Sequence, residues 1–410
     1  MNPRVLFVDE DQAHNGSTVS LEYLLDGFRS GGYDVDVLTW KIDPKNKTRM
    51  QESARVIDAR SRLVRAITLH VHFAYVQSPF SPAGIRMILK DLVKLPAGIL
   101  VVMRTIRRLK PDIVYANEYS VLQASIAAAL CGVPAVMHIR SPLIRGKWGI
   151  RRRLVLRNVL AFNNAIFAIS RQEMEQFHPR GRQKEKLRVI GEFVTGPSPG
   201  PEDQGRFREA FGFTPGRPVV SMLGGIRDIK GTLDFLRAAE ILSAGGSGTQ
   251  FVVAGNAHLI GTPEGRAYYD SCMDLVDRLQ KKGTLRFLGN IPNPLELICA
   301  SDIIVSPSTD SHFSRPVVEA WRMERPVVAV RTPHMEDLIT HGVNGLLVDR
   351  WDEIGLAEAI GRLLADRGLR SELAGKGKLK ALAEFDAQKN IGTILTVCAS
   401  LLPGMKGSMA

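Results

Sequence analysis

Short apolar runs alternate with longer amphipathic stretches along almost the whole chain. Short runs of apolar and β-branched residues are typical of buried strands, whereas apolar residues spaced three and four apart indicate helices. Because strands that alternate with helices form βαβ units, an α/β fold with parallel sheets is expected. The pattern predicts strands at 5–8, 33–40, 113–116, 135–139, 165–169, 218–222, 251–254, 285–288, 303–306 and 327–330. It predicts helices at 17–30, 120–130, 232–242 and 265–281, and one more near Glu319.

One stretch rich in Pro, Gly and Ser, at residues 195–205, interrupts this alternation. Such a composition favours turns and linkers, and a chain of 410 residues suits two cores better than one. We therefore predict two doubly wound Rossmann-like domains that face a cleft, at 1–198 and 199–384. Residues 385–410 are predicted to form a C-terminal helix and a disordered tail, and a return of this helix to the N-terminal domain is left open.

The stretch at 80–110 reads as a helix with a broad apolar face and a basic end. Two interpretations fit this pattern. It can be a core helix that leads into the strand at 113–116, or a helix that lies in a membrane interface. The sequence leaves both open.

The net charge of +12 belongs to the first half of the chain, because residues 1–200 hold 30 of the 54 Lys and Arg but only 17 of the 42 Asp and Glu. Such a field attracts polyanions or an anionic membrane surface, and the alternative is a solvated basic face. No reading motif and no interleaved aromatic residues accompany the charge, so we expect no nucleic acid as partner.

Four cysteines lie far apart, and we therefore expect no disulfide framework and no metal site. No cofactor is expected either. No window reaches the length of a membrane span, and the N-terminal residues lack the pattern of a signal peptide. The expected location is the cytoplasm, with a peripheral place on the inner face of the cytoplasmic membrane left open.

Ligands of doubly wound sheets bind where strands end and helices begin, so the loops at those points hold the candidate residues. In the first such loop, Gly16 and Ser17 open a helix, with Ser17 as its cap and free N–H groups that attract phosphate. A simple capped turn is the alternative.

In a later loop, Gly224 and Gly225 end a strand and Lys230 precedes a helix. A lysine there opposes the helix dipole unless an anion lies between them, and Arg227 with Lys230 could hold a diphosphate. The alternative is an exposed surface lysine.

A third loop contains Ser311, His312, Phe313 and Ser314 and leads into the helix with Glu319. Pro316 suits the first helical position and places Glu319 in the first turn, where its charge favours the dipole. The other interpretation is an acceptor for vicinal hydroxyls such as those of a ribose.

A fourth candidate is a strand end where His138 and Arg140 share one face. A hydrogen-bonded core histidine is the ordinary interpretation of His138. Arg140 is the better candidate for binding a charged ligand.

Several blocks in this order resemble a retaining GT-B glycosyltransferase of glycosyltransferase family 4. The blocks are NGSTVSLEYLLDGFRSGGYDVDVLT, LGGIRDIKG, LRFLGNIPNPLELICASDIIVSPSTDSHFSRPVVEAWRMERPVVAV and HGVNGLLVD. The resemblance implies transfer of a hexose from a UDP- or GDP-linked sugar to a saccharide or lipid-linked saccharide, in surface polysaccharide or lipopolysaccharide biosynthesis. It also implies front-face attack without a protein nucleophile or a metal.

The resemblance also assigns roles to single residues. Glu319 matches the glutamate that binds the nucleotide ribose, and Lys230 matches the lysine that contacts the donor diphosphate. Gly16 matches the glycine that faces the phosphate or the transferred sugar. Asn290 and Ile291 lie where the backbone contacts the base.

Three positions depart from the family pattern. Gly225 stands where an arginine is expected beside the phosphate, and Arg227 is close enough to replace it. Ser311 stands where the first glutamate of the pair is expected, eight residues before Glu319. Arg140 stands where many members have a histidine. These departures leave an alternative function open, a catalytically impaired protein that binds nucleotide sugar or serves as a scaffold subunit.

Overall fold

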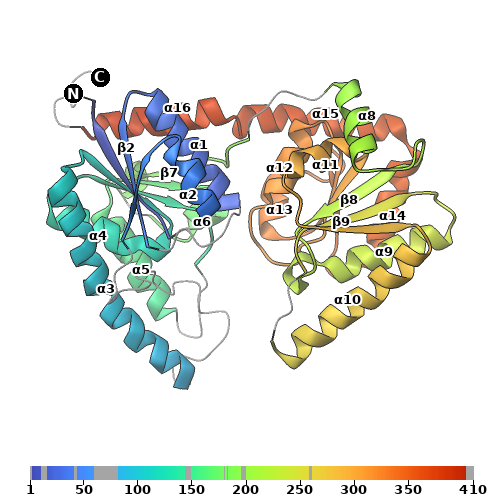
Figure 1. The fold of residues 1–410 in the computed structure, drawn as a ribbon, viewed down its shortest axis with the longest axis horizontal. Helices are drawn as coiled ribbons and strands as arrows, with labels where there is room; N and C mark the ends of the chain where they lie inside the picture. Colours follow the sequence, from blue (N-terminus) through green and yellow to red (C-terminus); the bar gives the residue numbers. More distant parts are fainter. Residues whose placement is uncertain are drawn as a thin grey trace. The chain divides into compact units, whose positions relative to one another are not determined.

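The computed structural model describes residues 2–10, 16–40, 44–59, 82–143, 149–179, 181, 183–194, 200–257 and 261–402. The chain divides into two compact units (Figure 1). Unit 1 contains Met1–Phe193 and Ala387–Ala410, and unit 2 contains Val194–Asp386. The tail predicted to be disordered, at 403–410, lies outside the described residues.

In unit 1 the described residues form a seven-stranded sheet in the order β3-β2-β1-β4-β5-β6-β7, with every neighbouring pair parallel. Its strands are β1 (Arg4–Val8), β2 (Asp34–Thr39), β3 (Arg55–Asp58), β4 (Ile113–Asn117), β5 (Ala135–Ile139), β6 (Ala165–Ala168) and β7 (Leu187–Val189). The helices around it are α1 (Gly16–Ser30), α2 (Pro44–Gln51), α3 (Pro82–Leu109), α4 (Leu122–Leu130), α5 (Ile150–Phe162), α6 (Arg171–Glu175), α7 (Gln183–Lys186) and α16 (Ala387–Ser400), with the 3-10 helix η2 (Tyr119–Val121).

In unit 2 the described residues form a six-stranded parallel sheet in the order β10-β9-β8-β11-β12-β13. Its strands are β8 (Val219–Leu223), β9 (Gln250–Ala254), β10 (Leu285–Gly289), β11 (Ile303–Ser306), β12 (Val327–Val330) and β13 (Leu346–Val348). The helices are α8 (Pro201–Ala210), α9 (Thr232–Ala244), α10 (Pro263–Lys281), α11 (Pro294–Ala300), α12 (Arg315–Arg322), α13 (Pro333–Leu338), α14 (Glu353–Ala365) and α15 (Arg367–Glu384), with the 3-10 helix η3 (Asp228–Lys230).

The two sheets share one strand order. Each starts from a central strand, β1 or β8, builds outward on one side for two strands and then continues from β4 or β11 on the other side. Because the connections reverse direction at this point, the loops after the two central strands separate and leave room for a ligand. The strand order therefore points to the carboxyl ends of β1 and β4 in unit 1, and of β8 and β11 in unit 2.

Helices cover both faces of each sheet. The strands therefore carry apolar side chains toward both faces, and their apolar residues follow one another along the chain. In unit 1, Leu6 and Val8 face one core with α3, α4 and α5, whereas Val5 and Phe7 face another with α1 and α16. Figure 1 shows this layering of helices about both sheets. The predicted α/β class and the doubly wound architecture are thus confirmed.

The predicted strands and helices are present, but several elements differ. The strands β3, β7 and β13 were not predicted, because three or four residues give too short a pattern. The predicted linker is wrong in its second half, since Pro201–Ala210 form helix α8. Pro201 occupies the first turn, and the Asp203 carboxylate accepts a hydrogen bond from the Gly200 N–H at 3.0 Å. The first half of the linker, at 195–199, lies outside the described residues.

The helix predicted at 80–110 is present as α3, and it divides into two parts. Its C-terminal part packs in the core through Val102, Ile106 and Leu109. Its N-terminal part exposes large apolar side chains, among them Leu92 and Val93 at 63% and 71% exposure. Each of the two interpretations left open by the sequence therefore fits one part of the helix.

A tight helix contact holds α12 in place. A Cβ added to Gly377 of α15 would lie 2.2 Å from Cδ1 of Trp321 on α12. The Trp321 ring is fully buried, and its Nε1–H donates to the Asn344 carbonyl at 2.8 Å. The ring has no free space into which it could move away from a methyl group.

We predict that Gly377→Ala lowers the free energy of unfolding by about 1–3 kcal/mol through overpacking against Trp321. Gly375→Ala on the same helix is the matched control, because nothing lies within 4 Å of its added Cβ. That control should gain about 0.5–1 kcal/mol from helix propensity. Chemical denaturation of both variants measures the difference, and equal effects would contradict the packing account.

Candidate functional site

The loops after β8 and β11 lie directly against each other in unit 2. Gly231 has φ of +64°, and a Cβ there would lie 1.9 Å from the Pro307 carbonyl oxygen. The Ser308 hydroxyl donates to the Ile229 carbonyl at 2.7 Å and joins the same two loops. Because β8 and β11 are the strands at which the connections reverse, these loops lie at the carboxyl-end position where the strand order predicts a ligand site.

Lys230 contacts both of these loops. The Lys230 stem runs along Gly224, where an added Cβ would come within 3.2 Å of it. Its Nζ lies 2.6 Å from Nε2 of His312 in the neighbouring loop. Burial, together with the positive charge of Arg227, lowers the pKa of Lys230 to about 8, although Asp310 opposes the shift. The Lys230 ammonium has therefore lost part of its hydration, and a bound anion would stabilise its charge.

His312 is held as a neutral acceptor beside this lysine. Burial and the Lys230 charge lower the pKa of His312 to about 4. Because a protonated Lys230 donates to Nε2, the imidazole proton is assigned to Nδ1, which faces the Asp310 carbonyl at 3.2 Å. The structure therefore brings together two residues that the sequence proposed separately, Lys230 and His312.

Gly224 and Gly225 lie beneath Lys230, against the end of β9. Both N–H groups donate to the Ala254 carbonyl at 2.9 Å, so the loop after β8 lies on the end of β9. Gly225 has φ of +69°, and an added Cβ would lie 2.0 Å from the Asn256 carbonyl oxygen. This backbone has no room for the arginine that the family pattern places at Gly225. Arg227, two residues later, is exposed.

The other predicted residues of the loop after β11 contact different parts of unit 2. Ser311 lies 2.8 Å, Oγ to Nδ1, from His334 on α13, a residue that the sequence did not suggest. Ser314 and Phe313 have other partners. Ser314 is buried against Ser306 at 3.0 Å, and the Phe313 ring packs on Phe385 with centroids 5.6 Å apart.

Glu319 belongs to the second turn of α12, and its predicted place in the first turn is wrong. The helix begins at Arg315, so Pro316 occupies the second helical position. The first turn of a helix tolerates proline there, because the N–H groups of that turn have no partner within the helix. Arg315 Nε donates to Glu319 Oε1 at 2.6 Å, and both side chains are largely buried. The Arg315 pair, and not the helix dipole, therefore compensates the Glu319 charge.

The other predicted donor residues stand at different strand ends. Asn290 and Ile291 follow β10, which the strand order separates from β8 by one strand. Gly16 is the first residue of α1 in unit 1, so the prediction that Ser17 caps this helix is wrong. Because the helix starts at Gly16, Ser17 is already helical.

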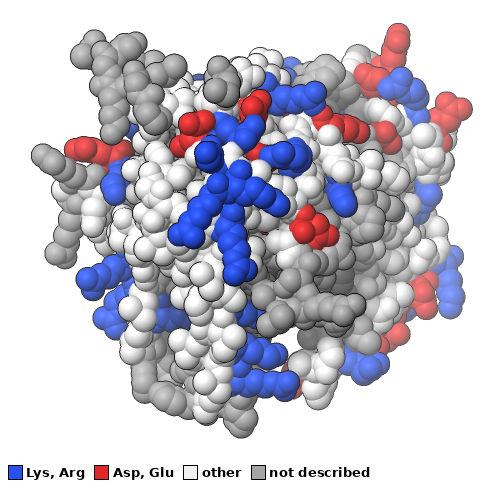
Figure 2. Space-filling view, turned by 60° about the vertical axis from the view of Figure 1, so that its left-hand side comes forward, with Lys and Arg blue, Asp and Glu red and all other residues white. Residues whose placement is uncertain are grey.

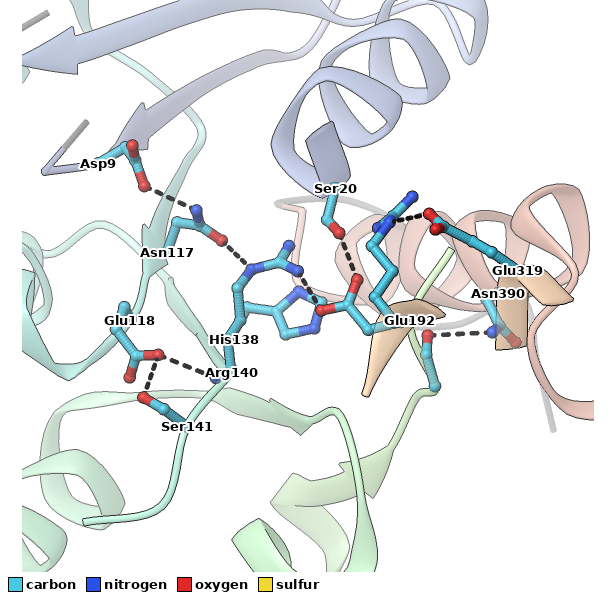
Figure 3. A network of polar contacts seen from close by, with 12 residues as sticks. Asp9, Ser20, Asn117, Glu118, His138, Arg140, Ser141, Glu192, Glu319 and Asn390 are labelled. Carbon is cyan, nitrogen blue, oxygen red and sulfur yellow. Dashed lines mark hydrogen bonds and ion pairs between the residues drawn. The ribbon is translucent and has the colours of Figure 1, made fainter. Parts of the chain in front are cut away.

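Unit 1 has a buried polar network at the carboxyl ends of its strands (Figure 3). Arg140, directly after β5, donates from Nε to Asn117 at 2.8 Å and from Nη1 to Glu192 at 2.9 Å. Asn117 in turn donates to Asp9 at 2.7 Å, and Ser20 of α1 donates to the second oxygen of Glu192. The network therefore joins β1, β4, β5, α1 and the residues after β7.

A second group of contacts holds the backbone at Arg140. Glu118 adopts a positive φ of +116°, and its carboxylate accepts the Arg140 N–H at 3.1 Å and the Ser141 hydroxyl at 2.8 Å. Behind Glu192, the Asn390 amide of α16 donates to the Gly191 carbonyl at 3.1 Å. Sequence reasoning missed the residues around Arg140. A shared signal, a polar residue at the end of a predicted strand, was present at Asp9 and Asn117. Glu192 follows β7, which the sequence did not predict.

His138 is a core residue. It is fully buried on β5, its Nδ1 lies 2.9 Å from the Tyr115 hydroxyl, and its ring contacts Phe167 and Phe193. Burial and the nearby Arg140 charge hold the pKa of His138 well below its ordinary value, so the ring is neutral. This placement favours the core interpretation of His138.

Two further properties concern the described part of the chain. No helix there is long and apolar enough to cross a membrane. In the same residues, no group of three or more His, Cys, Asp or Glu side chains is placed to bind a metal ion.

The sequence matches two successive domain families. Residues 15–191 match the family described as glycosyl transferase 4-like domain, and residues 217–366 match glycosyl transferases group 1. A similar curated protein is the lipopolysaccharide core biosynthesis glycosyltransferase LpsE of Rhizobium meliloti (strain 1021), 30% identical over 35% of this chain and 41% of that protein. Another is the D-inositol 3-phosphate glycosyltransferase of Nocardia farcinica (strain IFM 10152), 26% identical over 53% of this chain and 49% of that protein. The chain thus aligns with about half the length of these relatives.

Solved structures show the same fold. The crystal structure of Anabaena Alr3699/HepE in complex with UDP has a TM-score of 0.75 and 20% identity, over 97% of this chain and all of that chain. WaaG, a glycosyltransferase involved in lipopolysaccharide biosynthesis, has a TM-score of 0.66 and 14% identity over 98% and 100%. These likenesses identify the architecture of the two units as the GT-B fold.

We predict that Glu192→Gln lowers the free energy of unfolding of unit 1 by about 3–5 kcal/mol, because it leaves the Arg140 charge buried without its carboxylate. The double variant Arg140→Met with Glu192→Gln should regain most of this loss, since it removes both charges. A chemical denaturation cycle of the two single variants and the double variant measures the coupling. Additive losses would show that the pair is not coupled.

Proposed function

Because the chain belongs to the glycosyl transferases of group 1, we propose that it transfers a hexose, with retention, from a nucleotide-diphosphate sugar to a saccharide or lipid-linked saccharide. The observation that carries this proposal is the partly buried Lys230 between the loops that follow β8 and β11. A partly buried ammonium at the point where strand connections reverse is a site for an anion such as a diphosphate. Structural neighbours crystallised with UDP and with UDP-glucose support the same class of donor.

The donor is placed by residues of unit 2. Lys230 binds the diphosphate, and Arg227 adds a second positive charge close to it in sequence. Glu319, oriented by Arg315, accepts hydrogen bonds from the ribose hydroxyls. The backbone at Asn290 and Ile291 lies beside the base, which is uracil or guanine, and Gly16 and Ser17 remain the proposed contacts of unit 1.

The reaction follows from what this site stabilises. The bond between the anomeric carbon and the diphosphate oxygen breaks, and the acceptor oxygen bonds to the same face of the sugar. The acceptor proton passes to the departing phosphate oxygen. Negative charge grows on the diphosphate as its bond breaks, and Lys230 and Arg227 stabilise that charge in the transition state. Because Arg140 is bound by Glu192 and His138 is enclosed in the core, we assign neither residue a step in the transfer.

The acceptor side is proposed to lie at an anionic membrane surface. The N-terminal part of α3 exposes Ile85, Ile88, Leu89, Leu92 and Val93. Exposed basic residues, including Arg86, Lys90, Arg104 and Arg108, follow one line along the same helix.

Helix α5 extends this surface, since Arg151 is paired with Asp91 of α3 at 2.9 Å and Ile150 and Leu154 are exposed. On the face drawn in Figure 2, Lys and Arg gather in patches between areas of uncharged surface. An apolar stripe flanked by cations suits the inner face of the cytoplasmic membrane. Assembly of lipopolysaccharide or surface polysaccharide on a lipid carrier is the proposed setting.

Two positions favour a second candidate function. Gly225 and Ser311 lack the arginine and the glutamate of the family pattern, and a protein without these contacts could bind nucleotide sugar without transferring it. This candidate, a scaffold or binding subunit, predicts donor binding without turnover in the presence of a correct acceptor.

We predict that one of UDP, GDP and ADP stabilises the native chain in a thermal-shift assay. A ligand at about 100 times its Kd adds roughly 2.7 kcal/mol to the state that binds it. Glu319→Ala and Lys230→Met should each weaken binding by about tenfold or more, because each removes a charge-assisted hydrogen bond. Lys376→Met is the matched control, since this lysine is exposed on α15. If no nucleotide shifts the melt, the proposed donor site is refuted.

We predict that the chain sediments with vesicles containing about one third anionic lipid and releases them at high salt, because the α3 cations are screened. Leu92→Asp with Val93→Asp should lower the bound fraction several-fold. Leu379→Asp on α15 is the control, because Leu379 is equally exposed, at 69%. Equal binding by the α3 variant and the native chain would rule out this surface.

A further inference from the structure

Among the described residues, the Lys230 ammonium has one hydrogen-bond partner, the imidazole of His312. Nζ of the lysine and Nε2 of the histidine lie 2.6 Å apart, and they come from the loops after β8 and β11. The Lys230 stem lies against Gly224, so the imidazole determines where the end of the side chain points. The group that directs this cation is thus a neutral ring from another strand end.

The other ring nitrogen fixes the direction of the His312 lone pair. Nδ1 lies 3.2 Å from the Asp310 carbonyl oxygen, and a carbonyl can only accept a hydrogen bond. The His312 backbone N–H donates to the same oxygen at 3.1 Å. In the neutral ring the proton is therefore on Nδ1, which leaves the lone pair of Nε2 directed at Lys230. The loop after β11 thus presents an acceptor, and not a donor, to the ammonium.

This contact favours the charged form of Lys230. A hydrogen bond from an ionised donor is stronger than one from a neutral amine, so an acceptor at this place stabilises the ammonium more than the amine. The contact therefore opposes burial and the Arg227 charge, which lower the pKa of Lys230 to about 8. Because an ammonium has three N–H donors and the imidazole accepts from one of them, the others remain for the oxygens of an anion.

The groups around the pair keep the acceptor neutral and the donor charged. Arg227 lowers the pKa of Lys230, and Asp310 raises it. For His312, burial and Lys230 lower the pKa to about 4, with His334 of α13 adding to the decrease and Asp310 opposing it. Between these two pKa values the ring is neutral and the lysine is charged. An imidazolium, in contrast, would have no lone pair for the ammonium and would repel it.

We propose, on the basis of the proposed function, that His312 is a positioning residue whose neutral imidazole holds the Lys230 ammonium between the two loops and keeps it in the protonated form that binds the diphosphate. The ring acts through Lys230 and needs no contact with the ligand. Donor binding is therefore coupled to one proton on Lys230, and His312 sets the pH at which this proton is lost.

The test is the pH dependence of UDP-glucose binding to the full chain, measured by calorimetry from about pH 6.5 to about pH 9. Both phosphates of this probe are esterified, so their charge does not change in that range. Because only the protonated lysine attracts them, the native affinity should be constant below the Lys230 pKa of about 8 and fall above it, by at most about tenfold per pH unit. If the nucleotide screen selects GDP or ADP, the probe is GDP-mannose or ADP-glucose.

Two variants separate the acceptor from the rest of the side chain. His312→Leu removes the acceptor and keeps an apolar side chain beside Lys230, so the fall in affinity should begin about one pH unit lower, the difference between a charge-assisted and a neutral hydrogen bond. The ratio of native to variant affinity should then rise about fourfold from about pH 6.5 to about pH 8. His312→Gln places an amide oxygen within reach of Nζ and should keep this ratio constant. Titration of the base cancels in these ratios.

A second measurement does not depend on the ligand. In the full chain with isotope-labelled lysine, the Lys230 resonance is identified by its absence in Lys230→Met, and an NMR titration gives its pKa. We expect a lower pKa in His312→Leu than in the native chain, and a pKa close to the native one in His312→Gln. An equal pKa in the native chain and in His312→Leu would overturn the inference.

The outcomes distinguish this inference from the proposed function. The same pH dependence of UDP-glucose binding in the native chain and in His312→Leu would overturn the role of His312 and leave the transferase proposal intact. An equal loss of affinity at every pH would overturn it too, because the ring would then contact the ligand or shape the loop. If the native chain binds no nucleotide sugar while the Lys230 pKa still falls in His312→Leu, the donor site is refuted and the coupling of the pair stands.

Discussion

The close approach of backbone segments at the centre of the second sheet is the constraint on which the surroundings of Lys230 depend. Gly225 lies against the Asn256 carbonyl and Gly231 against the Pro307 carbonyl, at separations that exclude any side chain. These contacts bring the loops after β8, β9 and β11 into one packed layer. Lys230 is held on this layer with its stem on Gly224, and its partial burial gives the ammonium its lowered pKa and its need for an anion.

Each unit has a cation at the carboxyl ends of its strands, but the surroundings of the two cations differ. Glu192 compensates the charge of Arg140 and Asn117 accepts from its Nε, while its buried Nη2 has no hydrogen-bond partner among the described residues. Its side chain and that of Glu192 are only 4% and 7% exposed, so the pair acts as a fixed part of unit 1. Lys230 has a neutral imidazole as its close partner. A compensated charge supports structure, whereas an incompletely compensated one is available to bind a ligand.

Helix α3 shows how one amphipathic pattern can serve two surroundings. It carries apolar side chains in both of its parts, buried at Val102 and Ile106 and exposed at Leu92 and Val93. Hydrophobic periodicity states which side of a helix is apolar, but the medium that covers that side depends on what packs against it. In unit 1, α4 covers the C-terminal part.

Much of the fold was predictable from the sequence because strands and helices of this type arise from local patterns. The apolar runs at β8, β11 and β12, and the glycines and lysine between them, predicted both the parallel sheet and the anion-binding loop. Short strands such as β3 were not predicted, because four residues give too short a pattern of apolar positions. Helix α12 starts one residue earlier than predicted, because proline is tolerated at either of two helical positions. Glu319 therefore lies in the second turn and not in the first.

The sequence by itself determined the fold class, the order of the elements and the residue types at the strand ends. Only the tertiary structure decided which of those residues meet. Lys230 and His312 are 82 residues apart, Arg140 and Glu192 are 52 apart, and Ser20 and Glu192 are 172 apart. No local pattern encodes such pairs, because they form only when parallel strands bring their carboxyl ends to one edge and burial makes each charge depend on its neighbour.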